Sequence, residues 1–401
     1  MFGRRVLCKL EEFMKSRSFI TKTLFPIASL LIFSACGGSG GDEEPLVDPP
    51  PVDIAALKIE LGQAIFNDPN LSEPAGQSCA DCHDLNSGFA DPNTSNLAPV
   101  SEGVVSGSFG NRNAPTAAYA SFIPDFHYDS TESQYVGGQF LDGRSADLED
   151  QAKGPFLNEL EMANTDEAMV IDKIKAASYA DVFRAVYGSA SLEDVTSAYE
   201  SVADAIATFE RTELFAPFSS KFDAYLAGTA QLTDQEARGL DLFQNKALCT
   251  ECHIIQEGNQ PQFTNFTYSN IGAPANPNNP FYDLDPNFVD IGLAGNPNLT
   301  TDISLEQGKF RVQTLRNVEL TAPYLHNGSL QTLEEVVNFY NTRDSNQCYG
   351  ANAEPFVNCW PLPEVEANVD IASMGDLLLT PEEEADLVAF MKTLTDGFSN
   401  N

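Results

Sequence analysis

The segment Cys79-Ala80-Asp81-Cys82-His83 decides how this sequence is interpreted. Two cysteines separated by two residues and followed directly by a histidine form the attachment pattern of c-type haem. The two thiols can bond to the two vinyl groups of the porphyrin, and the adjacent imidazole can then bind the iron as an axial ligand. We therefore expect a haem attached at Cys79 and Cys82, with His83 on its iron.

The same pattern returns as Cys249-Thr250-Glu251-Cys252-His253, which indicates that one structural unit is used twice. A glycine and a phenylalanine precede each copy at the same spacing: Gly62 and Phe66 before the first, Gly239 and Phe243 before the second. A zinc site or a thioredoxin-type redox pair leaves the histidine after each cysteine pair unexplained. We therefore expect a second haem on Cys249 and Cys252, with His253 as its iron ligand.

The length of 401 residues is sufficient for two domains, which suits one haem motif in each. Apolar residues at helical spacing run through residues 163–226, and helices are also predicted at residues 54–66 and 381–394. No convincing sheet pattern is visible. The predicted fold class is mainly α, with two c-type cytochrome-like haem domains in tandem at residues 54–228 and 229–401.

Residues 1–35 have the features of an export signal, because basic residues precede an apolar run that is too short to span a membrane. The run ends in Ser34-Ala35-Cys36, which resembles the lipobox of bacterial lipoproteins, where the cysteine becomes the lipidated first residue. Residues 36–53, rich in glycine and proline, predict a flexible tether. The expected location is the periplasm or the cell surface, with a lipid on Cys36 as the anchor to the outer membrane.

The chain is strongly acidic, with a formal net charge of -36. This charge argues against nucleic acid as a partner and favours cationic partners or bound Ca²⁺. Cys348 and Cys359 flank a polar, proline-containing loop. We expect these two cysteines to form a disulfide, because export would place them in an oxidising compartment.

Two further stretches carry a resemblance to a known family: QFLDGRSADLEDQA at residues 139–152 and TLRNVELTAPYLHNGS at residues 314–329. Together with the two haem motifs in this order, they are similar to the bacterial di-haem cytochrome c peroxidase and MauG family. The resemblance covers roughly residues 55–395. It implies the di-haem cytochrome c peroxidase fold, two covalently bound haems c, H₂O₂ as a substrate and a redox partner protein.

The resemblance assigns the peroxide site to the first haem, with Gln139 and Glu149 at the positions of the family's distal pair. A carboxylate can move a proton between the two oxygens of peroxide, and an amide can orient it. One departure from the family is Leu141, where many relatives carry tryptophan. His127 matches no family motif, so we expect a structural or surface histidine and an open coordination position on the first iron.

On the second haem, the family's axial ligand follows the histidine of the Pro-Tyr-x-His motif by fourteen residues, and this position is Tyr340. Conventional peroxidases carry methionine there, whereas MauG carries tyrosine. A phenolate ligand stabilises ferric and higher states, and a thioether raises the reduction potential. We favour Tyr340; the alternative ligand is Met374, which precedes the last helix, and Tyr340 is then a buried aromatic residue.

The family also places Ca²⁺ between its haem domains, and Asn113, Thr321 and Pro323 match ligand positions. Backbone carbonyls and amide side chains are suitable oxygen ligands for this ion. The calcium expectation rests on the resemblance alone.

Charge relay between the haems commonly uses a tryptophan in this family, and Phe122 stands near the relay position here. Tyr119 and Tyr128 are the alternative relay residues. Trp360 is the single tryptophan of the chain. It is either an exit relay towards a partner or an apolar anchor of the disulfide loop, and we prefer the anchor.

Three hypotheses for function follow. A MauG-like enzyme would activate H₂O₂ at the first haem and oxidise a partner protein. A conventional peroxidase would reduce H₂O₂ to water with electrons from a small cytochrome or cupredoxin. A non-enzymatic di-haem carrier would only pass electrons. We favour the MauG-like enzyme because of Tyr340.

Overall fold

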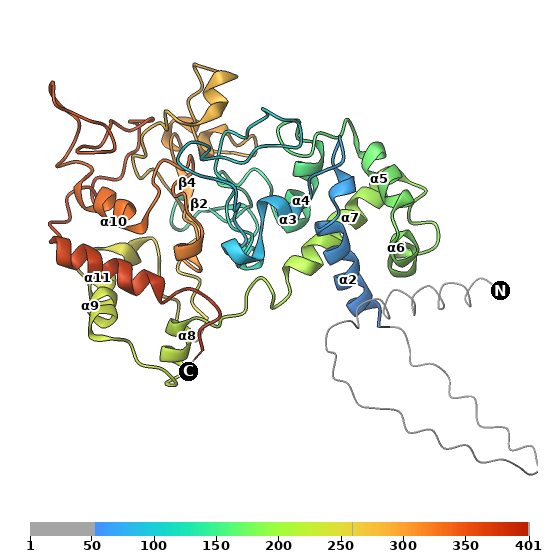
Figure 1. Ribbon diagram of the computed structural model, residues 1–401, viewed down its shortest axis with the longest axis horizontal. Coiled ribbons are helices and arrows are strands. Elements are labelled where there is room, and N and C mark those ends of the chain that lie inside the picture. Colours follow the sequence, from blue (N-terminus) through green and yellow to red (C-terminus); the bar gives the residue numbers. More distant parts are fainter. Residues whose placement is uncertain (1–52, 259, 400–401) are drawn as a thin grey trace, which may run out of the picture.

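The computed structural model describes residues 53–258 and 260–399, and the fold is built mainly from helices joined by long irregular segments (Figure 1). The predicted export signal, nearly all of the tether and Cys36 lie outside the described residues. Within the described part of the chain, no helix has both the length and the apolar character needed to cross a membrane.

The first half of the chain is organised around the long helix α7, Val195–Glu210. Helix α2, Ile54–Phe66, packs across it at Gly62, where a side chain would collide with the carbonyl oxygen of Ala205 at 2.0 Å. Phe66 meets Phe209 edge to face, with ring centroids 5.5 Å apart. The remaining helices of this half surround the same core: α3 (Cys79–Cys82), α4 (Leu148–Leu157), α5 (Glu167–Ala176) and α6 (Ala180–Tyr187).

The second half repeats this contact with helices α9, Asp234–Gln244, and α11, Pro381–Lys392. A side chain at Gly239 would lie 2.0 Å from the carbonyl oxygen of Asp386, and Phe243 packs on Phe390 with centroids 5.1 Å apart. Capping boxes begin α9 and α11, in which a threonine and a glutamate satisfy the first free amides. Helices α8 (Lys221–Leu226) and α10 (Leu333–Thr342) complete this half.

The two largest apolar clusters separate along the chain. One runs from Leu57 to Phe215, and the other from Phe222 to Leu394. Helix α8 therefore packs with the second half, although the sequence placed its residues before the boundary at 228. In Figure 1 the two groups of helices lie at opposite ends of the molecule.

Strands are few and short among the described residues. β1 (His127–Asp129) pairs with β2 (Gln134–Val136), and β3 (Tyr268–Ser269) pairs with β4 (Phe310–Arg311), both antiparallel. Short 3-10 turns lie between the larger elements: Pro69–Leu71, Leu85–Ser87, Ala120–Phe122, Cys249–Glu251, Pro280–Asp283, Leu293–Gly295, Ile303–Leu305 and Val318–Leu320. The fold is mainly α, as the sequence predicts.

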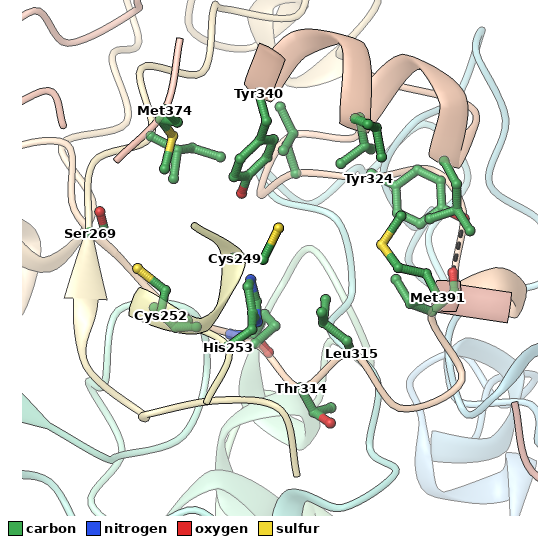
Figure 2. A pocket seen from close by; sticks show the side chains of 18 of the residues that line it. Cys249, Cys252, His253, Ser269, Thr314, Leu315, Tyr324, Tyr340, Met374 and Met391 are labelled. Atoms are coloured by element: carbon green, nitrogen blue, oxygen red, sulfur yellow. Dashed lines mark hydrogen bonds between the residues drawn. The ribbon is translucent and has the colours of Figure 1, made fainter. Parts of the chain in front are cut away.

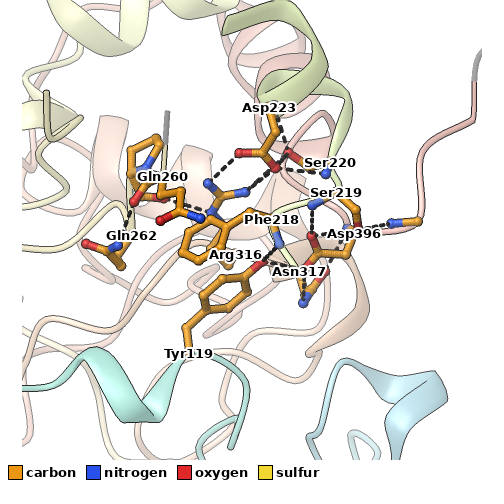
Figure 3. Close-up of polar contacts among 12 residues, drawn as sticks. Tyr119, Phe218, Ser219, Ser220, Asp223, Gln260, Gln262, Arg316, Asn317 and Asp396 are labelled. Atoms are coloured by element: carbon orange, nitrogen blue, oxygen red, sulfur yellow. Dashed lines mark hydrogen bonds and ion pairs between the residues drawn. The ribbon is translucent and has the colours of Figure 1, made fainter. Parts of the chain in front are cut away.

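A buried polar cluster around Arg316 and Tyr119 joins the two halves (Figure 3). Arg316 is fully buried and donates to both carboxylate oxygens of Asp223, at 2.6 and 2.7 Å. Its guanidinium also lies 5.3 Å from the ring centroid of Tyr119, which comes from the first half. The hydroxyl of Tyr119 donates to Asp396 near the end of the chain, at 2.8 Å. Segments far apart in the sequence are thus held at one point.

The loop between α10 and α11 carries the disulfide, which joins Cys348 and Cys359. Trp360 is buried beside it, edge to face with Phe339, and its indole N–H donates to the hydroxyl of Thr342 at 2.9 Å. These contacts are those of an apolar anchor that fixes the loop on α10.

Two candidate haem sites

The first cavity, of about 200 Å³, is lined by Cys79, Cys82 and His83. The imidazole Nδ1 of His83 lies 3.0 Å from the carbonyl oxygen of Phe89. A carbonyl oxygen can only accept, so Nδ1 carries the proton and Nε2 keeps its lone pair. Burial lowers the pKa of His83, which favours this neutral imidazole. The side chain is therefore prepared as an iron ligand.

The second cavity, of about 270 Å³, repeats this arrangement with Cys249, Cys252 and His253 (Figure 2). Here Nδ1 of His253 is 2.9 Å from the carbonyl oxygen of Phe263, and burial again lowers the pKa of the imidazole. All four cysteines are free thiols that line a cavity. Two thiols, a neutral imidazole and an enclosed apolar space are the donor set that a c-type haem requires, so the residues of both sites fit this group.

Gln139 lines the first cavity. It is buried, and its side-chain amide donates to the carbonyl oxygen of Ala120 at 3.2 Å. Leu141, at the family's tryptophan position, lines both cavities. Of these two residues, Gln139 is a polar group in the first cavity, and Leu141 is an apolar group shared by both cavities.

Glu149 is placed differently. It lies in the first turn of α4, and its carboxylate accepts hydrogen bonds from both terminal nitrogens of Arg211, at 2.6 and 2.8 Å. These hydrogen bonds lower the pKa of Glu149. Leu148 and Ala152 of the same helix line the first cavity, whereas Glu149 is not part of its wall. Its role in proton transfer stays a prediction.

Two carboxyl groups that the sequence did not single out do line the first cavity, those of Glu161 and Glu210. Glu210 is the last residue of α7 and follows Ile206, another wall residue, by one helical turn. Glu210 lies inside the helical region predicted at residues 163–226, but apolar spacing alone does not reveal a carboxyl group on the cavity face.

Both proposed ligands of the second iron line the second cavity. Tyr340 projects from α10, and Figure 2 shows its hydroxyl directed into the cavity on the side opposite His253. Burial raises the pKa of this phenol, so the phenolate needs a nearby positive charge such as a ferric iron. Met374 lies beside it, and the amide of Gly375 donates to the carbonyl oxygen of Tyr340 at 2.7 Å. Either Tyr340 or Met374 can therefore be the ligand of the second iron.

The expected calcium ligands are partly brought together. The side-chain amide of Asn113 contacts the carbonyl oxygen of Pro323, and Thr321 lines the second cavity with both. Within the described residues, no three histidine, cysteine or acidic side chains converge as a metal site. Ca²⁺ binding at these residues remains a prediction that depends on carbonyl and amide oxygens.

The predicted relay residues lie away from both cavity walls. Phe122 is 40% exposed, Tyr128 is 38% exposed on β1, and Tyr119 is buried at the junction in Figure 3. His127 is exposed, with Nδ1 2.7 Å from the carbonyl oxygen of Asp125. The residues that line both cavities are Asn113, Ala114, Pro115, Thr116, Leu141 and Arg311.

Two cavities of this kind define the class of protein: a di-haem c-type protein made of two cytochrome-like units. Comparison with known proteins makes the class specific. The sequence profile of the di-haem cytochrome c peroxidase family matches residues 56–231. The chain is 37% identical to the methylamine utilization protein MauG of Paracoccus denitrificans over 378 residues, which are 92% of this chain and 94% of that protein.

A second relative is the cytochrome c551 peroxidase of Nitrosomonas europaea, 33% identical over 325 residues, or 79% of this chain and 83% of the relative. Among solved structures, the diheme peroxidase BthA of Burkholderia thailandensis has a TM-score of 0.74 at 31% identity, covering 86% of this chain and 89% of that one. The chain belongs to the di-haem cytochrome c peroxidase and MauG family, and it is a di-haem oxidoreductase. The family implies two c-type haems.

Proposed function

We propose that the protein activates H₂O₂ in the first cavity and, with Tyr340 on the second iron, uses the resulting oxidising equivalents to oxidise a partner protein. The observation that carries this proposal is the Tyr340 hydroxyl directed into the second cavity opposite His253 (Figure 2). A phenolate ligand stabilises the oxidised forms of a haem, so the second site can share oxidising equivalents.

Each residue has a stated task in this proposal. When bound, the haems supply the metal that takes peroxide and the place where oxidising equivalents are held. His83 and His253 would hold the irons through Nε2, because each Nδ1 proton is donated to a backbone carbonyl. Gln139 orients the substrate from the wall of the first cavity. Glu149, held by Arg211 at the start of α4, takes part in proton movement.

Met374 supports the second candidate function, a peroxidase that reduces H₂O₂ to water with electrons from a small cytochrome or cupredoxin. Its side chain lines the same cavity as Tyr340, and a thioether ligand raises the reduction potential of a haem. With this ligand, the second haem would pass electrons to the first rather than share its oxidised state.

Low-temperature electron paramagnetic resonance of the ferric protein, before and after stoichiometric H₂O₂, separates these functions. We expect one high-spin haem, one low-spin haem without the optical charge-transfer band of methionine ligation, and an oxidised state spread over both haems. A methionine-ligated low-spin haem, with peroxide reactivity only after one-electron reduction, would establish the second candidate instead.

We also propose that the mature protein is held at the periplasm or cell surface by a lipid on Cys36. The lipobox-like sequence supports this location. Replacing Cys36 by serine should move the protein from the membrane fraction to the soluble fraction without changing its haem content. Retention of Cys36→Ser in the membrane fraction would contradict the lipid anchor.

A further inference from the structure

Glu210 is a carboxyl group enclosed at the wall of the first cavity. Its side chain is 6% exposed, and it faces the same space as Cys79 and Gln139. Among residues 53–258 and 260–399, no group forms a hydrogen bond or ion pair with this carboxyl. A buried carboxylate without a partner is strongly disfavoured in a medium of low dielectric constant, so the neutral acid is the stable form.

The neighbouring charges do not relieve this burial. Arg211 is the next residue, but both of its terminal nitrogens are bound to Glu149, with which it forms a surface ion pair. Burial and the charge of Glu149 raise the pKa of Glu210 to about 8, and Arg211 opposes the shift only in part. Glu210 therefore carries its proton at neutral pH.

The other titratable groups on the wall of this cavity are His83, Arg112, Arg144, Glu161, Arg311 and the two cysteines. Burial also raises the pKa of Glu161, but this side chain has a hydrogen-bonding partner. The carboxylate of Glu161 accepts a hydrogen bond from the amide of Asn158 at 2.8 Å. Arg144 lines the cavity and donates to Asp142 at 2.9 Å. The thiols of Cys79 and Cys82 no longer titrate once they become thioethers. Glu210 is the wall group that combines a removable proton with the absence of a hydrogen-bonding partner in the described chain.

We propose that Glu210 is the internal proton store of the first cavity and acts through the space it faces on the bound peroxide. This inference rests on the proposed peroxide reaction. Reduction of H₂O₂ to two molecules of water consumes two protons and two electrons, and the partner protein that is oxidised in the proposed function supplies the electrons. As the O–O bond breaks, the O–H bond of Glu210 breaks, and its proton goes to the oxygen that leaves as water. The second proton comes from solvent, which also restores the Glu210 acid after turnover.

The test compares the haem-loaded wild type with Glu210→Gln and with Glu200→Gln. Glu200 lies on the same helix, but its side chain is 57% exposed and pairs with Lys153, so its variant controls for the replacement of a carboxyl group by an amide outside the cavity. Infrared difference spectra across a pH titration should show a protonated carboxylic acid that titrates in the wild type and in Glu200→Gln. The band should be missing in Glu210→Gln.

The rate of the peroxide reaction provides the second measurement. In the wild type it should fall as pH rises through the pKa of Glu210, whereas in Glu210→Gln it should be about a hundredfold lower and lack this pH dependence. The infrared band persisting in Glu210→Gln, or an unchanged rate and pH profile, would overturn the proposal. If Glu149→Gln alone removes the pH dependence, the proton is held by Glu149 and the proposal is equally wrong.

This design distinguishes failure of the proposed function from failure of the Glu210 proposal. A wild-type protein that does not react with H₂O₂ contradicts the proposed function, while the infrared titration still decides whether Glu210 holds a proton. If Glu210→Gln does not assemble with haem, Glu210→Asp provides a second variant, in which the titrating band should persist at a shifted frequency. An unshifted band in Glu210→Asp would assign the proton to another residue.

Discussion

The two halves of the molecule present the same haem-attachment residues and differ in the other groups that line their cavities. In both, a glycine brings two helices into backbone contact, and a histidine Nδ1 is bound to a backbone carbonyl. The first cavity then offers Gln139 and the buried acid Glu210, whereas the second offers Tyr340 and Met374. Attachment is therefore a property of the repeated unit, and chemistry is a property of the groups that each half adds to it.

The largest expected effect concerns whether the halves are independent. Arg316→Met leaves Asp223 as a buried carboxylate without its partner, which should lower the free energy of unfolding by about 4 kcal/mol. Thermal unfolding followed by calorimetry and by haem absorbance should then separate into two transitions. Arg316 also touches the Tyr119 ring of the first half, so a single cooperative transition in the variant would show that the halves are coupled by contacts other than those of Arg316.

The next effect tests the equivalence of the helix contacts. Gly62→Ala and Gly239→Ala each force a methyl group against a carbonyl oxygen, and each should lower the free energy of unfolding by about 3 kcal/mol in urea titration. Gly154→Ala is the control, because its new methyl group would meet the ring of Phe140 at an ordinary 3.4 Å. A large loss at one glycine alone would mean that the two units are not equivalent.

Tyr340→Met should change the second half alone. We expect the reduction potential of the second haem to rise on the order of 0.1 V in spectroelectrochemical titration, with little change at the first haem. Tyr324→Phe is the matched control, because Tyr324 lines the same cavity but its hydroxyl is bound to the carbonyl oxygen of Val318 at 2.8 Å. If Met374→Leu shifts the potential and Tyr340→Met does not, Met374 is the ligand.

The smallest expected effect is on the pH dependence of stability, which should differ between Glu149 and Glu210, the two carboxyl groups beside Arg211. Because Arg211 lowers the pKa of Glu149, this ion pair stabilises the fold above the ordinary carboxyl pKa, and the contribution is lost as pH falls through the lowered value. Its exposed position limits the contribution to about 0.5 kcal/mol. The stability difference between wild type and Glu149→Gln should vanish in acid. A difference that persists there would mean that Glu149 stabilises through packing.

Glu210 should show the opposite dependence. Its raised pKa means that the folded protein binds more protons than the unfolded chain, so its contribution to stability is present below the ordinary carboxyl pKa and declines as pH rises to about 8. Glu210→Gln should remove this decline, which urea titrations at several pH values would measure. A decline of equal size in the variant would assign it to other groups.

The sequence predicts the repeat well because local patterns define it. Helix α2 has the predicted bounds, Ile54–Phe66, and α11 begins at Pro381 as predicted, because apolar spacing marks both helices. The boundary between the halves was harder to predict. Helix α8 packs on the second half through Phe222, which contacts apolar residues far away in the sequence. Such contacts leave no local pattern in the sequence.

The sequence does not predict which side chains face the first cavity. The family motif identifies Gln139 and Glu149, but the rotation of α4 decides which side chains face the cavity. Leu148 and Ala152 take that face, and Glu149 turns to Arg211. Glu210 escaped notice because its isolation depends on Arg211 being occupied elsewhere. The direction of a side chain and the commitments of its neighbours are properties of the packed structure.

The hydrogen bond from Tyr119 to Asp396 has a consequence for biosynthesis. The two residues are 277 positions apart, and Tyr119 belongs to the core of the first half. This contact can form only after the ribosome has released nearly the whole chain. Until then, the phenol hydroxyl lacks its acceptor and keeps only the hydrogen bond that it accepts from the amide of Phe218 at 3.1 Å. The segment around Asp396 therefore completes the packing of the first half.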